Sequence, residues 1–147
     1  MRYELKDLAC QLPSSLSDFE KGYACGLIFT SEVYVDDNPT GYSALHYELH
    51  LAEIISQDQG VEKIKRECVD QMEYWKNDNL DPFSDDNIDE LTLGYLLCMT
   101  HQGQGTGLWA EEEYKKYDQG NACSYGLQLD IYLDVDHNFT EAHCNRN

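Results

Sequence analysis

The sequence predicts an α+β fold in which several N-terminal helices precede a small antiparallel sheet, with one helix inserted before the last strands. Two observations carry this prediction. Helix-start signals and helical periodicity fall in the first half of the chain, whereas strict apolar–polar alternation falls near its end. The length of 147 residues is the usual size of one domain, and neither a repeat nor a linker divides it. We therefore expect residues 1–147 to form a single domain.

The first predicted helix begins at a capping box. Ser17, followed three residues later by Glu20, can satisfy two free N–H groups of a helix start, and apolar residues then recur at helical spacing. We expect a helix from about residue 18 to 31. It should end before residues 33–35 (Val-Tyr-Val), and residues 36–41 predict a turn-rich loop.

Two further helices are expected before the middle of the chain. One covers about residues 43–56 and is broken by Gly60. The next has the clearest helical periodicity and an opposite face charged in both signs, so it should pack an apolar stripe on the core. The stripe consists of Val61, Ile64, Cys68, Met72 and Trp75.

The second half of the chain begins with an acidic, breaker-rich stretch at residues 77–90. The dense apolar run 91–100 then predicts either a buried strand or a short helix that enters one. Glycines at 103, 105 and 107 allow a tight hairpin. Three glutamates at 111–113 suit the positive N-terminal end of a helix that we expect to reach about residue 124.

The closing segment predicts a pair of strands. Apolar residues alternate with polar ones from Leu127 to Leu133, which is typical of a half-buried strand. Residues 134–138 are turn-forming and should lead into a last short strand.

Composition excludes several classes of protein. The chain carries 28 acidic and 10 basic side chains, a net charge of −18. Because 41% of its residues are hydrophobic and 12% aromatic, this charge belongs to a folded body rather than to a disordered tail. Direct binding of nucleic acid needs a basic surface, and anionic membranes repel acidic proteins. We therefore expect neither nucleic acid nor membrane as a direct partner.

The sequence also predicts a cytoplasmic protein. No apolar run approaches the length of a membrane span, and the N-terminus lacks the basic and then apolar pattern of a signal peptide. Cysteines at 10, 25, 68, 98, 123 and 144 include no Cys-x-x-Cys pair. We expect reduced thiols that are mostly buried, rather than disulfides or a zinc site.

Three motifs resemble ligand sites, but each has a simpler interpretation. His46 and His50 are four residues apart on a predicted helix, but no glutamate directly follows His46 as in zinc proteases. Residues 134–138 (Asp-Val-Asp-His-Asn) copy the start of a calcium loop without its later glycine and glutamate. The glycine-rich loop 101–107 lacks a lysine and precedes three glutamates, which repel phosphate. We therefore expect no cofactor, no metal and no catalytic residue, and hence no enzyme.

Almost half of the net charge lies in residues 77–118, with ten acidic residues against Lys115 and Lys116. If the net charge is spread evenly over roughly 7,700 Å² of surface, its density per unit area is about four times lower than that of duplex DNA. If the same charge is gathered on a third of the surface, its density approaches that of DNA. One negative face forms if the loop before Leu91 lies beside Glu111; the simpler interpretation is a solvated surface that keeps the protein soluble. The expected partner-binding residues are Asp78, Asp81, Asp85, Asp86, Asp89, Glu90, Glu111, Glu112, Glu113, Asp118 and Trp109.

The run from Leu96 to Trp109 resembles the glycine-rich signature of a family of small, acidic, uncharacterised bacteriophage proteins, Thr-x-x-Gly-x-Gly-x-Gly-[Phe/Leu]-Trp. Residues 19–23 resemble the opening helix of that family, and residues 125–136 its closing strand and Asp-rich turn. The chain departs from the family with Leu108 in place of Phe and with Ala-Glu at 110–111 where Asp-Arg is common. The resemblance implies an origin in a phage, prophage or other mobile element, but no activity.

Charge and implied origin together favour an accessory protein that inhibits a host nucleic-acid-binding defence protein. The partner would be a basic CRISPR effector or restriction enzyme, whose groove the acidic face would occupy as a DNA mimic. One alternative is a phage accessory or regulatory protein that binds a protein partner through an aromatic surface around Trp109 and Tyr114. Another is a small-molecule or metal-binding domain around the glycine hairpin and His101. The sequence leaves the oligomeric state open, a homodimer included.

Overall fold

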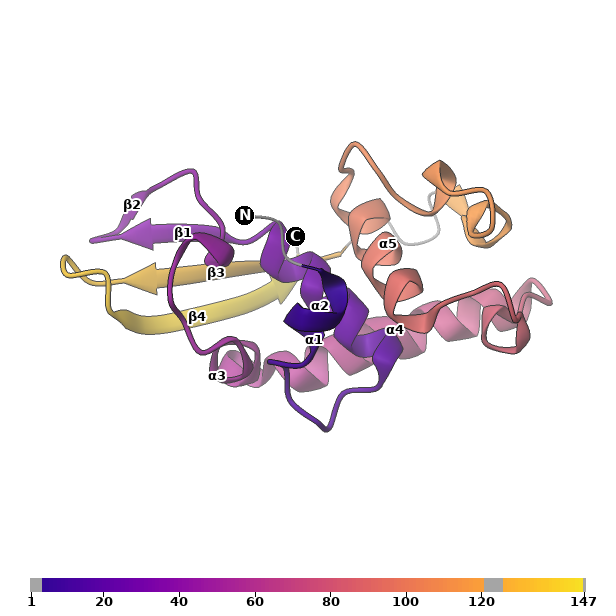
Figure 1. The fold of residues 1–147 in the computed structure, drawn as a ribbon, viewed down its shortest axis with the longest axis horizontal. Helices are drawn as coiled ribbons and strands as arrows, with labels where there is room; N and C mark the ends of the chain where they lie inside the picture. Colours follow the sequence, from indigo (N-terminus) through magenta and orange to yellow (C-terminus); the bar gives the residue numbers. More distant parts are fainter. Residues whose placement is uncertain (1–3, 121–125, 147) are drawn as a thin grey trace.

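The computed structural model describes residues 4–120 and 126–146, and it confirms the α+β class. Figure 1 shows the sheet at one end of the molecule and, at the other, the loops on either side of the helix at residues 90–102; the long helix at residues 60–77 extends toward that second end. The α-helices are α1 (Leu5–Ala9), α2 (Asp18–Phe29), α3 (Leu51–Ser56), α4 (Gly60–Asn77) and α5 (Glu90–Gln102).

The four-stranded sheet is mixed, which corrects the prediction of an antiparallel one. Its order is β2-β1-β3-β4, with β1 (Glu32–Val35), β2 (Asn38–Pro39), β3 (Leu127–Leu133) and β4 (Phe139–Arg146). The pairs β1–β2 and β3–β4 are antiparallel, but β1 and β3 run parallel, with Val33 opposite Ile131. A parallel pair needs a long crossover, and α3, α4 and α5 lie within the one between β1 and β3.

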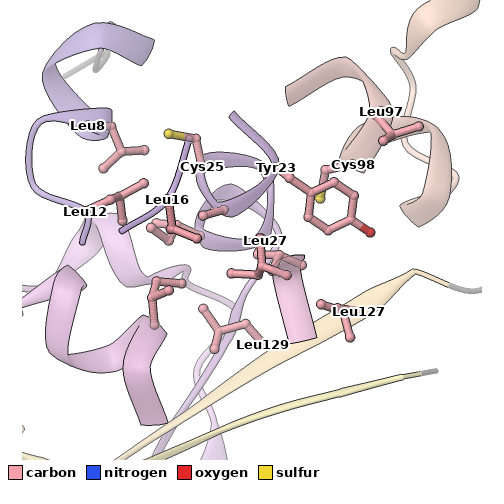
Figure 2. Close-up of a cluster of buried hydrophobic side chains, with 14 of the residues drawn as sticks. Leu8, Leu12, Leu16, Tyr23, Cys25, Leu27, Leu97, Cys98, Leu127 and Leu129 are labelled. Carbon is pink, nitrogen blue, oxygen red and sulfur yellow. The ribbon is translucent and has the colours of Figure 1, made fainter. Parts of the chain in front are cut away.

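Strand β3 confirms the predicted alternation. Its residues are buried at every second position from Leu127 to Leu133, whereas Gln128, Asp130 and Tyr132 are half-buried. Because successive side chains of a strand point to opposite faces, one face of the sheet contributes to the core. The core cluster in Figure 2 includes side chains of α1, α2, α5 and β3.

Helices α2 and α5 cross in close contact at two glycines. A Cβ atom built on Gly22 would lie 2.0 Å from the carbonyl oxygen of Leu91, and one built on Gly94 would lie 2.0 Å from that of Phe19. Each backbone therefore rests where a side chain would otherwise stand. This crossing fixes the position of α5, and with it the acidic loop that enters α5.

Helix α2 begins at the predicted capping box. Glu20 N donates a hydrogen bond of 3.2 Å to Ser17 Oγ, and Ser17 N donates one of 2.8 Å to Glu20 Oε1. The helix ends at Phe29, two residues before the expected end.

Helix α4 confirms the predicted stripe except at its edge. Ile64 and Trp75 are buried, but Met72 is 43% exposed. Gln71 is buried instead. Since a helix turns by about 100° per residue, the buried arc is centred near Ile64 and Gln71, and Met72 stands roughly a quarter turn from that centre.

The apolar run 91–100 is helical, which decides between the two predicted alternatives. Asp89 Oδ2 accepts a hydrogen bond from Thr92 N at the start of α5, and Gly103, with φ of 65°, ends the helix. The glycines therefore follow a helix and do not close a hairpin, which corrects that prediction. Gly103 occupies the left-handed position at which helices commonly end.

Two predicted helices are wrong in part. Within residues 43–56 only the 3-10 helix η1 (Ala44–His46) and the later α3 form, so the predicted continuous helix is wrong. Residues 45–50 are alternately half-buried and exposed, a pattern typical of extended chain. After the glycines the chain forms the 3-10 helices η4 (Leu108–Ala110) and η5 (Lys115–Tyr117) and no α-helix as far as residue 120. Three adjacent glutamates repel one another, and Tyr114 and Tyr117 are buried three residues apart, which suits a 3-10 turn. Residues 121–124 of that prediction lie outside the described residues.

Candidate partner-binding face

The two acidic segments lie side by side. Tyr117 Oη donates a hydrogen bond of 2.7 Å to Asp85 Oδ2, and Lys116 Nζ lies 3.0 Å from the same oxygen. Asp89 N donates to Tyr114 Oη at 3.1 Å. These contacts join the loop before α5 to the segment around η5. We call the carboxylates of both segments the acidic face: Asp78, Asp81, Asp85, Asp86, Asp89, Glu90, Glu111, Glu112, Glu113 and Asp118.

The C-terminal end of α4 packs against both segments. Trp75 Nε1 donates a hydrogen bond of 2.8 Å to Tyr117 O, and the Trp75 ring packs edge-on against both Phe83 and Tyr117. Gln119 Nε2 donates to Asp78 Oδ2 at 2.6 Å. One buried tryptophan thus anchors the two acidic segments to a single helix.

Half of the ten carboxylates take part in local structure. Asp81 accepts a hydrogen bond from Phe83 N, and Asp89 accepts one from Thr92 N at the start of α5. The others bonded in this way are Asp78, Asp85 and Asp118. Their oxygens are already partly occupied, so they are the less available half of the predicted site.

The remaining carboxylates are exposed to solvent. Glu112 is 87% exposed, and its Oε2 lies 3.8 Å from Lys115 Nζ. The other four, Asp86, Glu90, Glu111 and Glu113, have no hydrogen bond or ion pair to any residue that the structure describes. These five are therefore the side chains of the acidic face that are best placed to meet a basic partner.

Asp85 differs from the rest of the face in its electrostatics. The hydrogen bond from Tyr117, then that from Asn87 N and the ammonium of Lys116, lower the pKa of Asp85 to about 2. In return, the carboxylate raises the pKa of Lys116. The side chain of Asp85 is only 14% exposed, so it ties the face together rather than projecting from it.

The aromatic residues near the face are divided between surface and core. Trp109 in η4 is 47% exposed, so its ring is accessible from the surface. Tyr114 is 7% exposed and its hydroxyl is bonded to Asp89 N. An aromatic surface at this place therefore includes Trp109 but not Tyr114, which corrects part of the alternative based on aromatic contacts.

The predicted helical pair His46 and His50 does not form. His46 lies in η1, where its Nδ1 accepts a hydrogen bond of 3.2 Å from Ser43 N and its ring packs on Tyr42, whereas His50 lies just before α3. Their spacing on a common helix face is lost. Within residues 4–120 and 126–146, no group of three or more His, Cys, Asp or Glu side chains could hold a metal ion.

The calcium-like residues 134–138 form the turn between β3 and β4. Asp134 Oδ1 accepts hydrogen bonds of 2.9 Å from both Asp136 N and Asn138 N. His137 has a φ of 66° and completes the reversal. The turn explains these residue types without an ion.

The glycine loop packs against its own helix. Thr100 Oγ1 donates a hydrogen bond to Leu96 O and accepts one of 3.0 Å from Leu108 N. A Cβ atom built on Gly107 would lie 2.6 Å from Thr100 Oγ1. His101 is buried at the end of α5, with Nδ1 hydrogen-bonded to Tyr23 Oη at 2.7 Å. These contacts make His101 part of the core and give the loop a packing role.

The residues that hold the face together were not predicted from the sequence. Tyr117 and Gln119 make its principal cross-links, and Trp75 appeared only as a core residue. The spacing of Tyr114 and Tyr117 places both rings on one side of a helical turn, but it does not distinguish a 3-10 turn from an α-helix.

The chain was compared with protein-family models, curated proteins and solved structures, and nothing matched. The resemblance to phage proteins therefore stays a prediction. Among the described residues, no helix has both the length and the apolar character needed to span a bilayer.

Proposed function

We propose that this is a phage or mobile-element accessory protein that inhibits a host nucleic-acid-binding defence protein, either a CRISPR effector or a restriction enzyme. The acidic face would occupy the basic groove in which the host protein holds DNA or RNA. The observation that supports this proposal is the contact between the two acidic segments through Tyr117 and Asp85, since each of these segments also carries exposed carboxylates.

The physical basis is electrostatic complementarity. A groove that binds nucleic acid presents Lys and Arg side chains to phosphates, and carboxylates at similar density can replace those phosphates. Opposite charges accelerate association and are screened by salt. The inhibitor acts by occupying the groove and needs no catalytic group of its own.

The decisive experiment measures binding and nuclease inhibition against a panel of purified CRISPR effectors and restriction enzymes. For a true partner, we expect affinity to fall by about tenfold or more between roughly 0.05 and 0.5 M salt. DNA cleavage should be inhibited at low salt and recover as salt rises. A binding constant indifferent to salt contradicts a charge-driven interface.

A charge-reversal triple variant tests the face itself. Replacement of Glu111, Glu112 and Glu113 by Lys should abolish inhibition, because it reverses three exposed carboxylates at once. The matched control replaces Asp7, Glu48 and Glu53 by Lys, which changes the net charge equally on exposed positions of α1, α3 and the segment before α3. If both variants lose inhibition alike, only net charge matters and the face is not the site.

The exposure of Trp109 supports a second candidate, an accessory or regulatory protein that binds a protein partner through an apolar contact. Trp109→Ala distinguishes the two. In the second candidate this variant abolishes binding, and salt has little effect. In the first, the Lys triple variant is the more damaging one.

A further inference from the structure

An apolar groove opens beside the acidic face. It has a volume of about 520 Å³ and lies between the C-terminal half of α4 and residues 79–83. Trp75, Leu80 and Phe83 contribute apolar lining, and Met72 lines it from the exposed side of α4. The groove is large enough for a bulky side chain and part of the backbone that carries it.

The groove is held in shape by contacts beneath it. Leu80 N donates a hydrogen bond of 2.8 Å to Trp75 O, so the chain turns back directly after α4. The Phe83 ring packs edge-on against Phe19 at 5.2 Å and against Trp75 at 6.1 Å. Phe83 N donates to Asp81 Oδ1, which fixes the following turn. A ligand would therefore enter a preformed site and would not need to open one.

The surroundings indicate what kind of ligand fits. Among the large apolar side chains that line the groove, Met72 is 43% exposed, so it is accessible to a ligand. The charged lining consists of Glu73 and Asp81 against Lys76. The groove is thus apolar within and net negative at its rim, which favours an apolar group carried on a basic segment.

We infer that this groove binds a bulky apolar side chain, such as Leu or Phe, from a Lys- or Arg-rich segment of the protein partner. The inference rests on the proposed function, because Asp81 belongs to both the groove and the acidic face. A second copy of this chain fits less well, since it would bring another net charge of −18 to the same surface. The carboxylates would attract the partner, and the groove would fix its register.

Two synthetic peptides test the inference directly. Both carry the same number of lysines, and they differ only at one central position, Leu in one and Ser in the other. We expect the Leu peptide to bind about tenfold more tightly, the gain typical of burying one such side chain. The protein is labelled with [methyl-¹³C]methionine, which gives three signals, from Met1, Met72 and Met99. The Met72 signal should shift with the Leu peptide, whereas that of Met99, only 4% exposed, should not.

Variants on the surface of α4 provide the controls. Met72→Gln keeps the charge and should remove most of the preference for Leu over Ser, whereas Met72→Leu should retain it. Val69→Gln changes a residue of similar exposure outside the groove lining and should leave the preference unchanged. Circular dichroism verifies that each variant is folded.

The outcomes separate the groove from the acidic face. Equal affinity for the two peptides, or an unshifted Met72 signal with the Leu peptide, overturns the groove inference. If the Lys triple variant at 111–113 then fails to bind either peptide, the proposed function stands without the groove. If the Leu preference and the Met72 shift persist but the triple variant binds as the wild type does, the groove stands and the acidic face is not the site.

Discussion

Tyr117 Oη donates a hydrogen bond of 2.7 Å to Asp85 Oδ2 and so joins two segments that lie on either side of helix α5 in the sequence. The same carboxylate accepts a hydrogen bond of 3.0 Å from Asn87 N and faces Lys116. Three partners of this kind favour the charged form, which is why the pKa of Asp85 is lowered to about 2. The Asp85 carboxylate is thus one of the links between the two halves of the acidic face, beside the hydrogen bonds from Gln119 to Asp78 and from Asp89 to Tyr114.

Tyr117→Phe should raise the pKa of Asp85 from about 2 toward its ordinary value of 3.8, because the hydroxyl is the largest cause of the shift. The folded-state pKa lies below the unfolded one, so the stabilisation from Asp85 is complete above the ordinary value and is lost as pH falls toward 2. Titration of the Asp85 carboxyl by ¹³C NMR measures this directly. Tyr34→Phe removes a hydroxyl bonded to Glu32 on the sheet and should leave the Asp85 titration unchanged.

Gly94→Ala should strongly destabilise the protein. The new Cβ would lie 2.0 Å from Phe19 O, so α2 and α5 would have to separate. We expect a loss of about 3 kcal/mol in the free energy of unfolding, measured by urea denaturation. Gly105→Ala is the matched control, because its Cβ would meet nothing within 4 Å, and a change of equal size there would contradict the packing argument.

Local signals predicted those parts of the fold that depend on neighbours in the chain. The capping box at Ser17 and Glu20 and the alternation from Leu127 to Leu133 both appear as expected, because each is satisfied within a few residues. The parallel pairing of β1 with β3 carries no such signal, since it depends on the route of the chain through three intervening helices. Residues 45–50 (Leu-His-Tyr-Glu-Leu-His) alternate between apolar and polar side chains, a pattern typical of an extended segment, although a helix was expected there.

The candidate site was predictable only in its composition. The ten acidic residues of 77–118 are visible in the sequence, but their adjacency depends on Tyr117 and Gln119 reaching back to Asp85 and Asp78. The groove could not be predicted, because Met72 belongs to an apolar stripe whose buried centre is set by what α4 packs against. Whether a residue at the edge of such a stripe is exposed depends on the tertiary packing around the helix.

Most described thiols should be unreactive in the native protein. Burial raises the pKa of Cys25 and of Cys144 to about 12 and also raises those of Cys68 and Cys98, so little reactive thiolate forms at neutral pH. Cys10 is exposed. When the rapidly reacting thiols of the native protein are counted with a disulfide reagent at about pH 8, Cys10→Ser should have one fewer than the wild type. Unfolding by denaturant should expose the buried thiols together, so that all of them react. Rapid reaction of Cys98 without denaturant would contradict its burial in the core.

Stability should depend on His101 in mildly acidic solution. Burial, followed by the charge of Arg146, lowers the pKa of His101 from 6.5 to about 4. The unfolded chain therefore binds this proton at higher pH than the folded chain does. Stability from the neutral imidazole is complete above pH 6.5 and is lost as pH falls toward 4. Between about pH 7 and 5 the wild type should lose about 2 kcal/mol through this residue.

The His101 contribution can be isolated by comparing two variants with the wild type. In His101→Gln, urea denaturation across the same pH range should lack this loss, while the contributions of the carboxylates remain and cancel in the comparison. Tyr23→Phe removes the 2.7 Å hydrogen bond but keeps the ring buried, so the pH dependence should persist if burial is its cause. If Tyr23→Phe abolishes it instead, the hydrogen bond and not desolvation keeps His101 neutral.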